Sequence, residues 1–417
     1  NQPAVAAALG AYLLQRPVRT QMDIETNMRL VGKRFAHQAK YKVGFNNDGK
    51  IVAVQVEIIS DCGYANSGMG SATSMYVDNT YNVPNWSITG KFVTTNKPPN
   101  TACRAPGALP GIAFMERIVD RVAIELGADP ATVRTANFYV ANDVTPTGAP
   151  LKYCSIGSLW AKLASSANVS ARLAAVTSFN ASSRWIKRGL AMTPVRYGIG
   201  WAGNNMATQI MVNATDGSVW VRSSGIESGQ GLNVKVAAVV ALELGIPMDL
   251  IKVLPASTSG TPNTGVTGGS IGSGECCAAA LIAAKELNAA LAPVKAMLTS
   301  AAAGAPPAWM ALVSKANAAG VNLSAYGWLA PKPPAAGPFR YSSYGAAVAE
   351  VEVNALTGET QILRYDVLFD CGISLNPAID VGQVEGATVM GIGNFVCEEL
   401  VYDATTGALV TDSTWTY

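Results

Sequence analysis

Polar side chains placed beside glycines, in four short stretches, are the residues best suited to chemistry in this chain. The four are residues 104–107 (RAPG), 229–231 (GQG), 267–272 (TGGSIG) and 380–386 (DVGQVEG). Each immediately precedes or opens an apolar helical pattern, and the free N–H groups of a first helical turn attract anions and acceptor-rich heterocycles. Glycine lets the backbone approach a ligand closely. The amides of Gln230 and Gln383 add donors and an acceptor in one planar group.

Taken singly, each of these stretches is more often a helix cap than a binding site. None of them matches the phosphate-binding pattern GxxxxGK[ST] or the dinucleotide-binding pattern GxGxxG. Four of them in one chain predict a large, acceptor-rich ligand that is held by many backbone contacts.

Histidine and cysteine chemistry fit this sequence poorly. His37 is the one histidine, so histidine-rich metal sites are excluded and a Ser-His-Asp arrangement has a single possible base. The seven cysteines are an odd number without a CxxC pair, which does not fit a disulfide framework or a thiolate metal site. The adjacent Cys276 and Cys277 are expected to pack beside an alanine-rich helix. We expect a reduced, cytoplasmic chain whose chemistry comes from a bound cofactor, with no metal held directly by protein side chains.

The bulk composition indicates a large protein with much internal surface. Of the 417 residues, 49% are hydrophobic and 14% are charged, which suits two or three domains with their own cores. A net charge of +2 without a Lys/Arg block argues against a nucleic-acid partner. No membrane span is expected, because charged residues interrupt long apolar stretches such as the one around Lys235.

Three hairpins and several helices must position the glycine-rich stretches. Residues 41–59, 210–224 and 349–369 each combine two alternating apolar runs with a tight DG or TG turn, which predicts a β-hairpin. Residues 112–126 and 234–244 have helical periodicity and are followed by a glycine stop.

The order of these elements predicts an α+β fold of two mixed units. The sequence divides near residue 165 into residues 1–165 and 166–417, with a helical excursion over residues 290–340 inside the second unit.

At the glycine-rich stretches the chain resembles the molybdenum-cofactor region of xanthine dehydrogenases and aldehyde oxidases. The matching stretches, in the family's order, are residues 16–45, 78–107 (ending TNKPPNTACRAPG), 225–231 (GIESGQG), 261–270 (TPNTGVTGGS) and 369–393 (containing SLNPAIDVGQVEGA). The resemblance implies two molybdopterin-binding subdomains, the first without its N-terminal part and the second without its C-terminal part.

Membership implies hydroxylation of an aldehyde carbon or of a carbon beside nitrogen in a heterocycle, with water as the oxygen source. Carried over by position, the residues that contact molybdopterin or approach the molybdenum are Arg104, Gln230, Gly268, Gly269, Ser270 and Gln383. The family also implies 2Fe–2S and FAD groups on electron-transfer domains or subunits outside this chain. We expect a homodimer as well.

The substrate pocket departs from the pattern of purine oxidation. Ala72 occupies the position of a purine-orienting arginine, Pro106 replaces an aromatic residue, and Trp201 is the opposite aromatic wall. Because alanine cannot donate a hydrogen bond to purine oxygens, the resemblance favours an aldehyde oxidase-like substrate over xanthine. The sequence also leaves open a xanthine dehydrogenase and a catalytically inactive scaffold of the same fold.

Two family elements have no counterpart in the sequence. The FGGK-type loop is expected before Asn1, and the glutamate that acts as general base is expected beyond Tyr417. Glu385 belongs to a matched helix and Glu398 to a helix end, so neither is assigned as the catalytic base.

Overall fold

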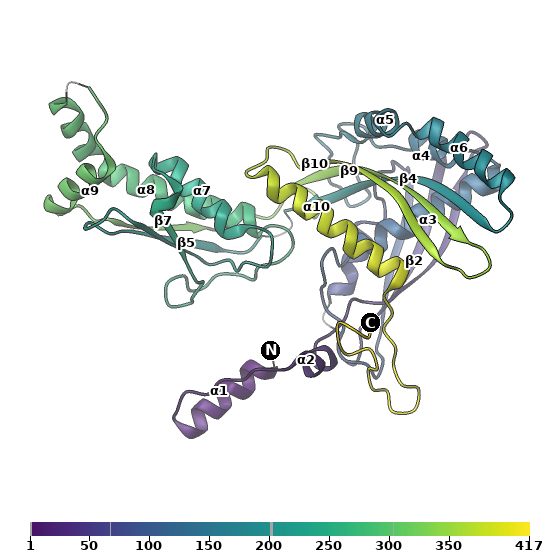
Figure 1. Ribbon diagram of the computed structural model, residues 1–417, viewed down its shortest axis with the longest axis horizontal. Helices are drawn as coiled ribbons and strands as arrows, with labels where there is room; N and C mark the ends of the chain where they lie inside the picture. The colour runs from purple at the N-terminus through teal and green to yellow at the C-terminus, as the bar shows by residue number, and fades with distance from the viewer. Residues whose placement is uncertain (1, 67, 201–202, 303) are drawn as a thin grey trace.

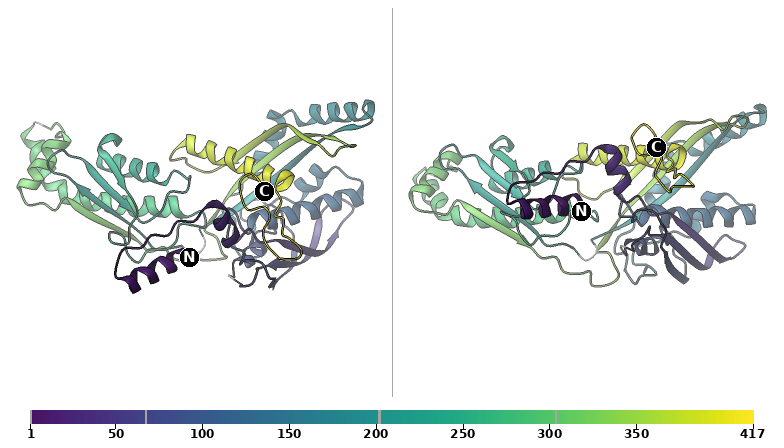
Figure 2. Two further views of the ribbon diagram at one scale, coloured as in Figure 1. Left: turned by 60° about the horizontal axis from the view of Figure 1, so that its bottom comes forward. Right: turned by 90° about the horizontal axis from the view of Figure 1, so that it is seen from below.

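Two lobes make up the chain, as the computed structural model shows (Figures 1 and 2). The structure describes residues 2–66, 68–200, 203–302 and 304–417. The large lobe holds two three-stranded sheets and the small lobe holds one four-stranded sheet. Helices pack against these sheets, and the α+β prediction is confirmed.

The first sheet of the large lobe has the order β1-β2-β3. Its elements are β1 (His37–Phe45), β2 (Ile51–Asp61) and β3 (Asn85–Val93), with the 3-10 helix η1 (Met69–Met75) between the last two and α3 (Ala108–Leu126) and α4 (Pro130–Ala136) after them. Burial alternates along β2, and its buried side chains pack against Met115 and Ile118 of α3. Gly127 ends α3 in the left-handed conformation, at φ 59°. Asp129 then caps α4, as the sequence predicts.

The second sheet of the large lobe is antiparallel and has the order β10-β9-β4. Its elements are β4 (Ile186–Ile199), β9 (Tyr341–Asn354) and β10 (Thr360–Asp370), covered by α5 (Ile156–Ser166) and α6 (Val169–Ser182). Trp160 and Leu163 of α5 pack against Met192 of β4 and Val348 of β9. The division near residue 165, which stays a prediction, therefore falls at the end of a helix that packs on this sheet.

The small lobe lies between β4 and β9 in the chain. It comprises β5 (Met206–Val212), β6 (Val219–Ser223), α7 (Leu232–Leu244), η2 (Met248–Leu250), β7 (Ile251–Leu254), α8 (Gly272–Ala301), α9 (Trp309–Ala318) and β8 (Ser324–Leu329). Its sheet order is β7-β6-β5-β8. The range 290–340, expected to be helical, also contains the strand β8, because Ala325 and Gly327 alternate inward between exposed neighbours.

Helix α8 is the one helix of the described residues that is long and apolar enough, by length and composition, to cross a membrane. Its buried side chains, among them Ala279, Ala283 and Leu287, form the core of the small lobe with strands β5 and β8. Packing against a sheet accounts for the apolar composition of this helix. Cys276 and Cys277 belong to the same core, as the sequence predicts.

The three predicted hairpins are confirmed as the antiparallel pairs β1–β2, β5–β6 and β9–β10. The remaining elements are α1 (Gln2–Leu14), α2 (Ile24–Leu30), α10 (Pro377–Ile392) and the π-helix η3 (Gly393–Cys397). Helix α10 crosses the boundary between the lobes (Figures 1 and 2). The glycine-rich residues 380–386 lie inside α10 as helical turns, and they do not form a loop ahead of it.

Candidate functional site

Three of the four glycine-rich stretches meet at the boundary between the lobes. Nη2 of Arg104, in the loop before α3, donates to Oε1 of Gln383 at 3.0 Å and to its backbone oxygen at 3.1 Å. Nε2 of Gln383 donates to the backbone oxygen of Gly229 at 2.7 Å. Arg104 and Gln383 are 279 residues apart in the chain, and Gly229 and Gln383 are 154 residues apart. The side chain of Gln383 therefore joins α10 to the large lobe on one side and to the small lobe on the other.

The fourth stretch is joined to the same region by Tyr197, near the end of β4. Its hydroxyl lies 3.1 Å from the hydroxyl of Ser270. Its ring stacks on Tyr76 at 5.4 Å between centroids, and Tyr76 packs against Phe339. Ala105 of the RAPG stretch contacts this aromatic cluster. The cluster thus fixes the distance between the RAPG stretch and the loop before α8.

The loop before α7 satisfies its own N–H groups. The carboxylate of Glu227 accepts from the backbone N–H of Gly229 at 3.0 Å, of Gly231 at 2.9 Å and of Asn233 at 3.1 Å. Partial burial raises the pKa of this carboxyl, but the backbone hydrogen bonds outweigh burial, and the pKa lies below its ordinary value.

The amide of Gln230 is likewise bonded within this loop, to the backbone of Ile226 and Ser228. The N–H groups at the start of α7 are therefore already occupied in this structure, and the contact of Gln230 with the cofactor stays a prediction. The signal in the sequence was a glutamate placed just before a helix start.

The loop before α8 is different. Gly269 and Ser270 both adopt positive φ, at 71° and 61°. Within the described part of the chain, the backbone N–H groups of Gly268, Gly269 and Ser270 have no hydrogen-bond acceptor. A Cβ added at Gly268 would meet nothing within 4 Å. This exposed loop therefore has N–H groups without acceptors, and such groups at a helix start can bind anions.

Of the predicted pocket residues, Pro106 belongs to the RAPG stretch, and the structure places Ala72 beside it. A Cβ at Gly107 would lie 2.4 Å from the backbone of Ala72, so the half-buried Ala72 is in direct contact with the loop that carries Arg104 and Pro106. Trp201 lies outside the described residues. None of the described residues forms a group of three or more His, Cys, Asp or Glu that could hold a metal ion.

A buried ion pair lies next to the aromatic cluster along β4, and the sequence analysis did not predict it. Nη2 of Arg196 donates to both carboxylate oxygens of Asp78 at 2.7 Å. The side chains are 2% and 3% exposed, and the hydroxyl of Tyr139 also donates to Asp78, at 3.0 Å. Because Arg196 directly precedes Tyr197, this pair holds β4 where the aromatic cluster forms.

Comparison with known proteins identifies the family of the chain. Two models described as a molybdopterin cofactor-binding domain match residues 1–138 and 162–417. The chain belongs to the molybdopterin cofactor-binding domain family.

The relatives of this family member are longer proteins. The chain is 38% identical to xanthine dehydrogenase 1 of Arabidopsis thaliana and 37% identical to probable aldehyde oxidase 3 of Oryza sativa, over 95% and 99% of its own length. It spans 30% and 31% of those proteins. Among solved structures, it is similar to the aldehyde oxidoreductase of Desulfovibrio desulfuricans, with a TM-score of 0.80 and 26% identity, covering 92% of this chain and 42% of that one.

The residues at the lobe boundary fit a molybdopterin. A pterin with a phosphate group presents many acceptors and a negative charge. The guanidinium of Arg104, the amide of Gln383 and the free N–H groups of residues 268–270 are complementary donors. Gly229, like Gly268, has open space where a Cβ would stand.

Replacing Tyr197 by phenylalanine tests its positioning role. The stacked ring remains, but Ser270 loses its partner, and a neutral hydrogen bond contributes about 1 kcal/mol. We expect roughly fivefold faster loss of molybdopterin from the full-length protein, with the thermal unfolding midpoint unchanged. The measurement is pterin release over time, with the exposed Tyr41→Phe as control. Equal release from both variants would remove Tyr197 from this role.

Proposed function

We propose that this chain is the molybdopterin-binding part of a molybdenum hydroxylase that oxidises aldehydes in preference to purines. The observation that carries the proposal is the meeting of Arg104, Gln383 and the Gly229 loop at one boundary. When bound, the cofactor would supply oxidation of a substrate carbon with water as the oxygen source.

The chain's own residues hold and orient the cofactor in this proposal. Arg104 and Gln383 would fix the pterin edge between the lobes, and the N–H groups of residues 268–270 would neutralise anionic oxygens. Electrons would pass from the cofactor to 2Fe–2S and FAD groups, which lie on domains or subunits outside this chain. A cytoplasmic homodimer completes the proposed assembly.

Ala72 and Pro106 support the preference for aldehydes. Both belong to the surface around the Arg104 loop, and neither side chain can donate a hydrogen bond to a purine oxygen. A pocket built to hydrogen-bond a polar substrate discriminates strongly, whereas an apolar pocket discriminates by roughly 1–3 kcal/mol per group. The similarity to xanthine dehydrogenases favours purine oxidation, so the two activities have to be compared directly.

The test uses the full-length protein. Its molybdenum and pterin content distinguishes an enzyme from an inactive scaffold, which would contain neither. For an enzyme, kcat/KM for benzaldehyde is then compared with kcat/KM for xanthine. Faster oxidation of xanthine would contradict the proposed preference.

Replacing Ala72 by arginine is expected to raise xanthine activity relative to benzaldehyde activity by at least roughly tenfold, because the new guanidinium can donate to purine oxygens. Ala72→Met is the matched control, since it adds length without donors. The measurement is the ratio of kcat/KM values at equal molybdenum content. A similar change in both variants would assign the effect to size and not to hydrogen bonding.

A further inference from the structure

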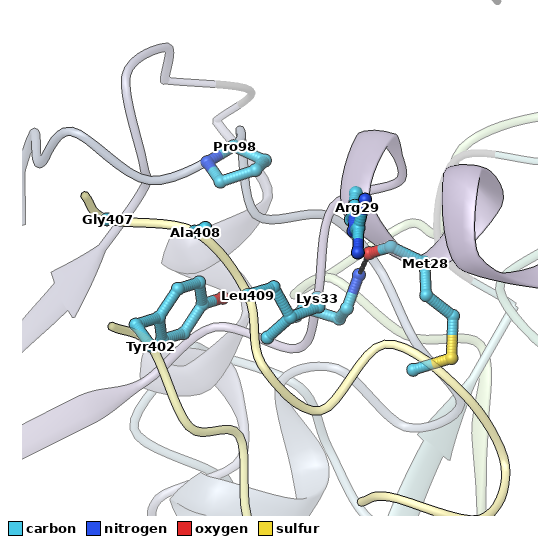
Figure 3. Close-up of a pocket in the computed structure, with 8 residues that line it drawn as sticks. All are labelled: Met28, Arg29, Lys33, Pro98, Tyr402, Gly407, Ala408 and Leu409. Atoms are coloured by element: carbon cyan, nitrogen blue, oxygen red, sulfur yellow. Dashed lines mark hydrogen bonds between the residues drawn. The ribbon is translucent and has the colours of Figure 1, made fainter.

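Residues from both ends of the sequence line a cavity. It has a volume of about 310 Å³ and lies between the end of α2, the loop at Pro98 and the turn that joins Tyr402 to Leu409 (Figure 3). Tyr402 and Leu409 form an isolated antiparallel bridge, which shapes that turn. Arg104, Gln383 and Ser270 do not line this cavity.

One wall of the cavity carries an ammonium group without an acidic partner. Nζ of Lys33 donates to the backbone oxygens of Met28 and, at 2.6 Å, of Val31. These are carbonyls at the C-terminal end of α2, which carry only partial negative charge. Within the described part of the chain, no carboxylate forms an ion pair with Lys33. Burial lowers the pKa of the ammonium, as expected for a cation that lacks a counterion.

The ammonium is held in place and keeps a free donor. An ammonium has three N–H bonds, and the two carbonyls use two of them. Because the carbonyls already fix its position, an anion that binds the third N–H would not have to order the side chain.

A second cation lies on the same wall. Arg29 is four residues before Lys33, and its side chain lines the cavity. It pairs with Asp412, which leaves other donors of the guanidinium free. The ammonium of Lys97 lies 5.1 Å from the ring centre of Tyr402, and it is paired with the carboxylate of Asp61 at 3.5 Å. Arg29 and Lys97 each have a carboxylate partner, whereas no carboxylate of the described residues pairs with Lys33.

The other walls are mainly apolar and include two rings. The rings of Pro98 and Tyr402 lie on different sides of the space, and Leu409 lies beside Tyr402 (Figure 3). A volume of about 310 Å³ is at the lower end of the range for ligand sites and suits a single ring with one substituent.

We propose that this cavity binds a small organic monoanion in which a carboxylate is joined to a flat apolar body. The carboxylate lies against Lys33 and Arg29, and the apolar body lies between Pro98 and Tyr402. This site is separate from the proposed molybdopterin site and does not depend on the proposed function.

Benzoate is the probe, and binding to the protein is measured by isothermal titration calorimetry. We expect one site per chain, and at least a tenfold rise in Kd for Lys33→Met. Lys42→Met, an exposed lysine on β1, is the matched control and should bind as the unaltered protein does.

Two further measurements keep the proposal testable if Lys33→Met fails to fold. Ala408→Trp places an indole in the cavity without changing a charge, and it should abolish benzoate binding. Benzyl alcohol has the ring without the charge, and inorganic phosphate has a negative charge without the ring. Each should bind at least tenfold more weakly than benzoate. The proposal is overturned by undetectable benzoate binding, by normal binding to Ala408→Trp, or by equal binding of either comparison compound.

Discussion

Replacing Asp78 by alanine will lower the free energy of unfolding by about 3–5 kcal/mol, the largest single effect on stability that we expect in this chain. The substitution leaves the guanidinium of Arg196 in the interior, where its side chain is only 2% exposed, without its carboxylate partner. Tyr139 loses its acceptor as well. Breaking a buried ion pair from one side is costly because the remaining charge stays desolvated.

Denaturant unfolding followed by tryptophan fluorescence provides the measurement. Asp249→Ala, at an exposed position in the small lobe, is the control and should change stability by less than about 0.5 kcal/mol. Replacing both partners, as Asp78→Leu with Arg196→Met, should recover part of the loss, because the unpaired charge is removed. A loss below about 1 kcal/mol in Asp78→Ala would contradict the buried-pair argument.

Replacing Gln383 by alanine will lower the molybdopterin affinity of the full-length protein by about tenfold or more. The side-chain amide accepts from Arg104 and donates to Gly229, so its removal takes one acceptor from the guanidinium and one hydrogen bond from the contact between α10 and the small-lobe loop. A hydrogen bond to a charged group contributes about 1.5–3 kcal/mol, which corresponds to a factor of roughly ten to a hundred.

The ratio of molybdenum and pterin to protein, measured after dialysis, reports this effect. Gln361→Ala, an exposed glutamine on β10, should retain the cofactor. Substrate preference among the molecules that keep cofactor should not change, because Gln383 is assigned to the cofactor and not to the pocket. Unchanged molybdenum content in Gln383→Ala would remove this residue from the site.

Sequence by itself determined the local elements of this protein. Each predicted hairpin has its two strands joined by a tight turn, so the pairing depends on neighbouring residues only. The ends of α3 and α7 follow from Gly127 and Gly245, which adopt the left-handed conformation with no steric cost. The family resemblance likewise rests on contiguous stretches that can be read without any structure.

Tertiary structure decided how these elements meet. Strands β4 and β9 pair although the whole small lobe lies between them in the chain, and no local pattern specifies such a pairing. Which donors at the helix starts are free was decided, by contrast, by hydrogen bonds between residues close in the chain. Glu227 fills the first turn of α7, whereas the equivalent loop before α8 keeps its N–H groups open.

Ion pairs between distant residues are likewise not specified by any local sequence pattern. Asp78 and Arg196, and likewise Arg29 and Asp412, are ordinary polar residues in the sequence, and they become partners only after the chain has folded. The strength of each pair depends on how much water is removed from it. Burial is a property of the packed molecule, and this is why the residue types could be read from the sequence while their roles required the fold.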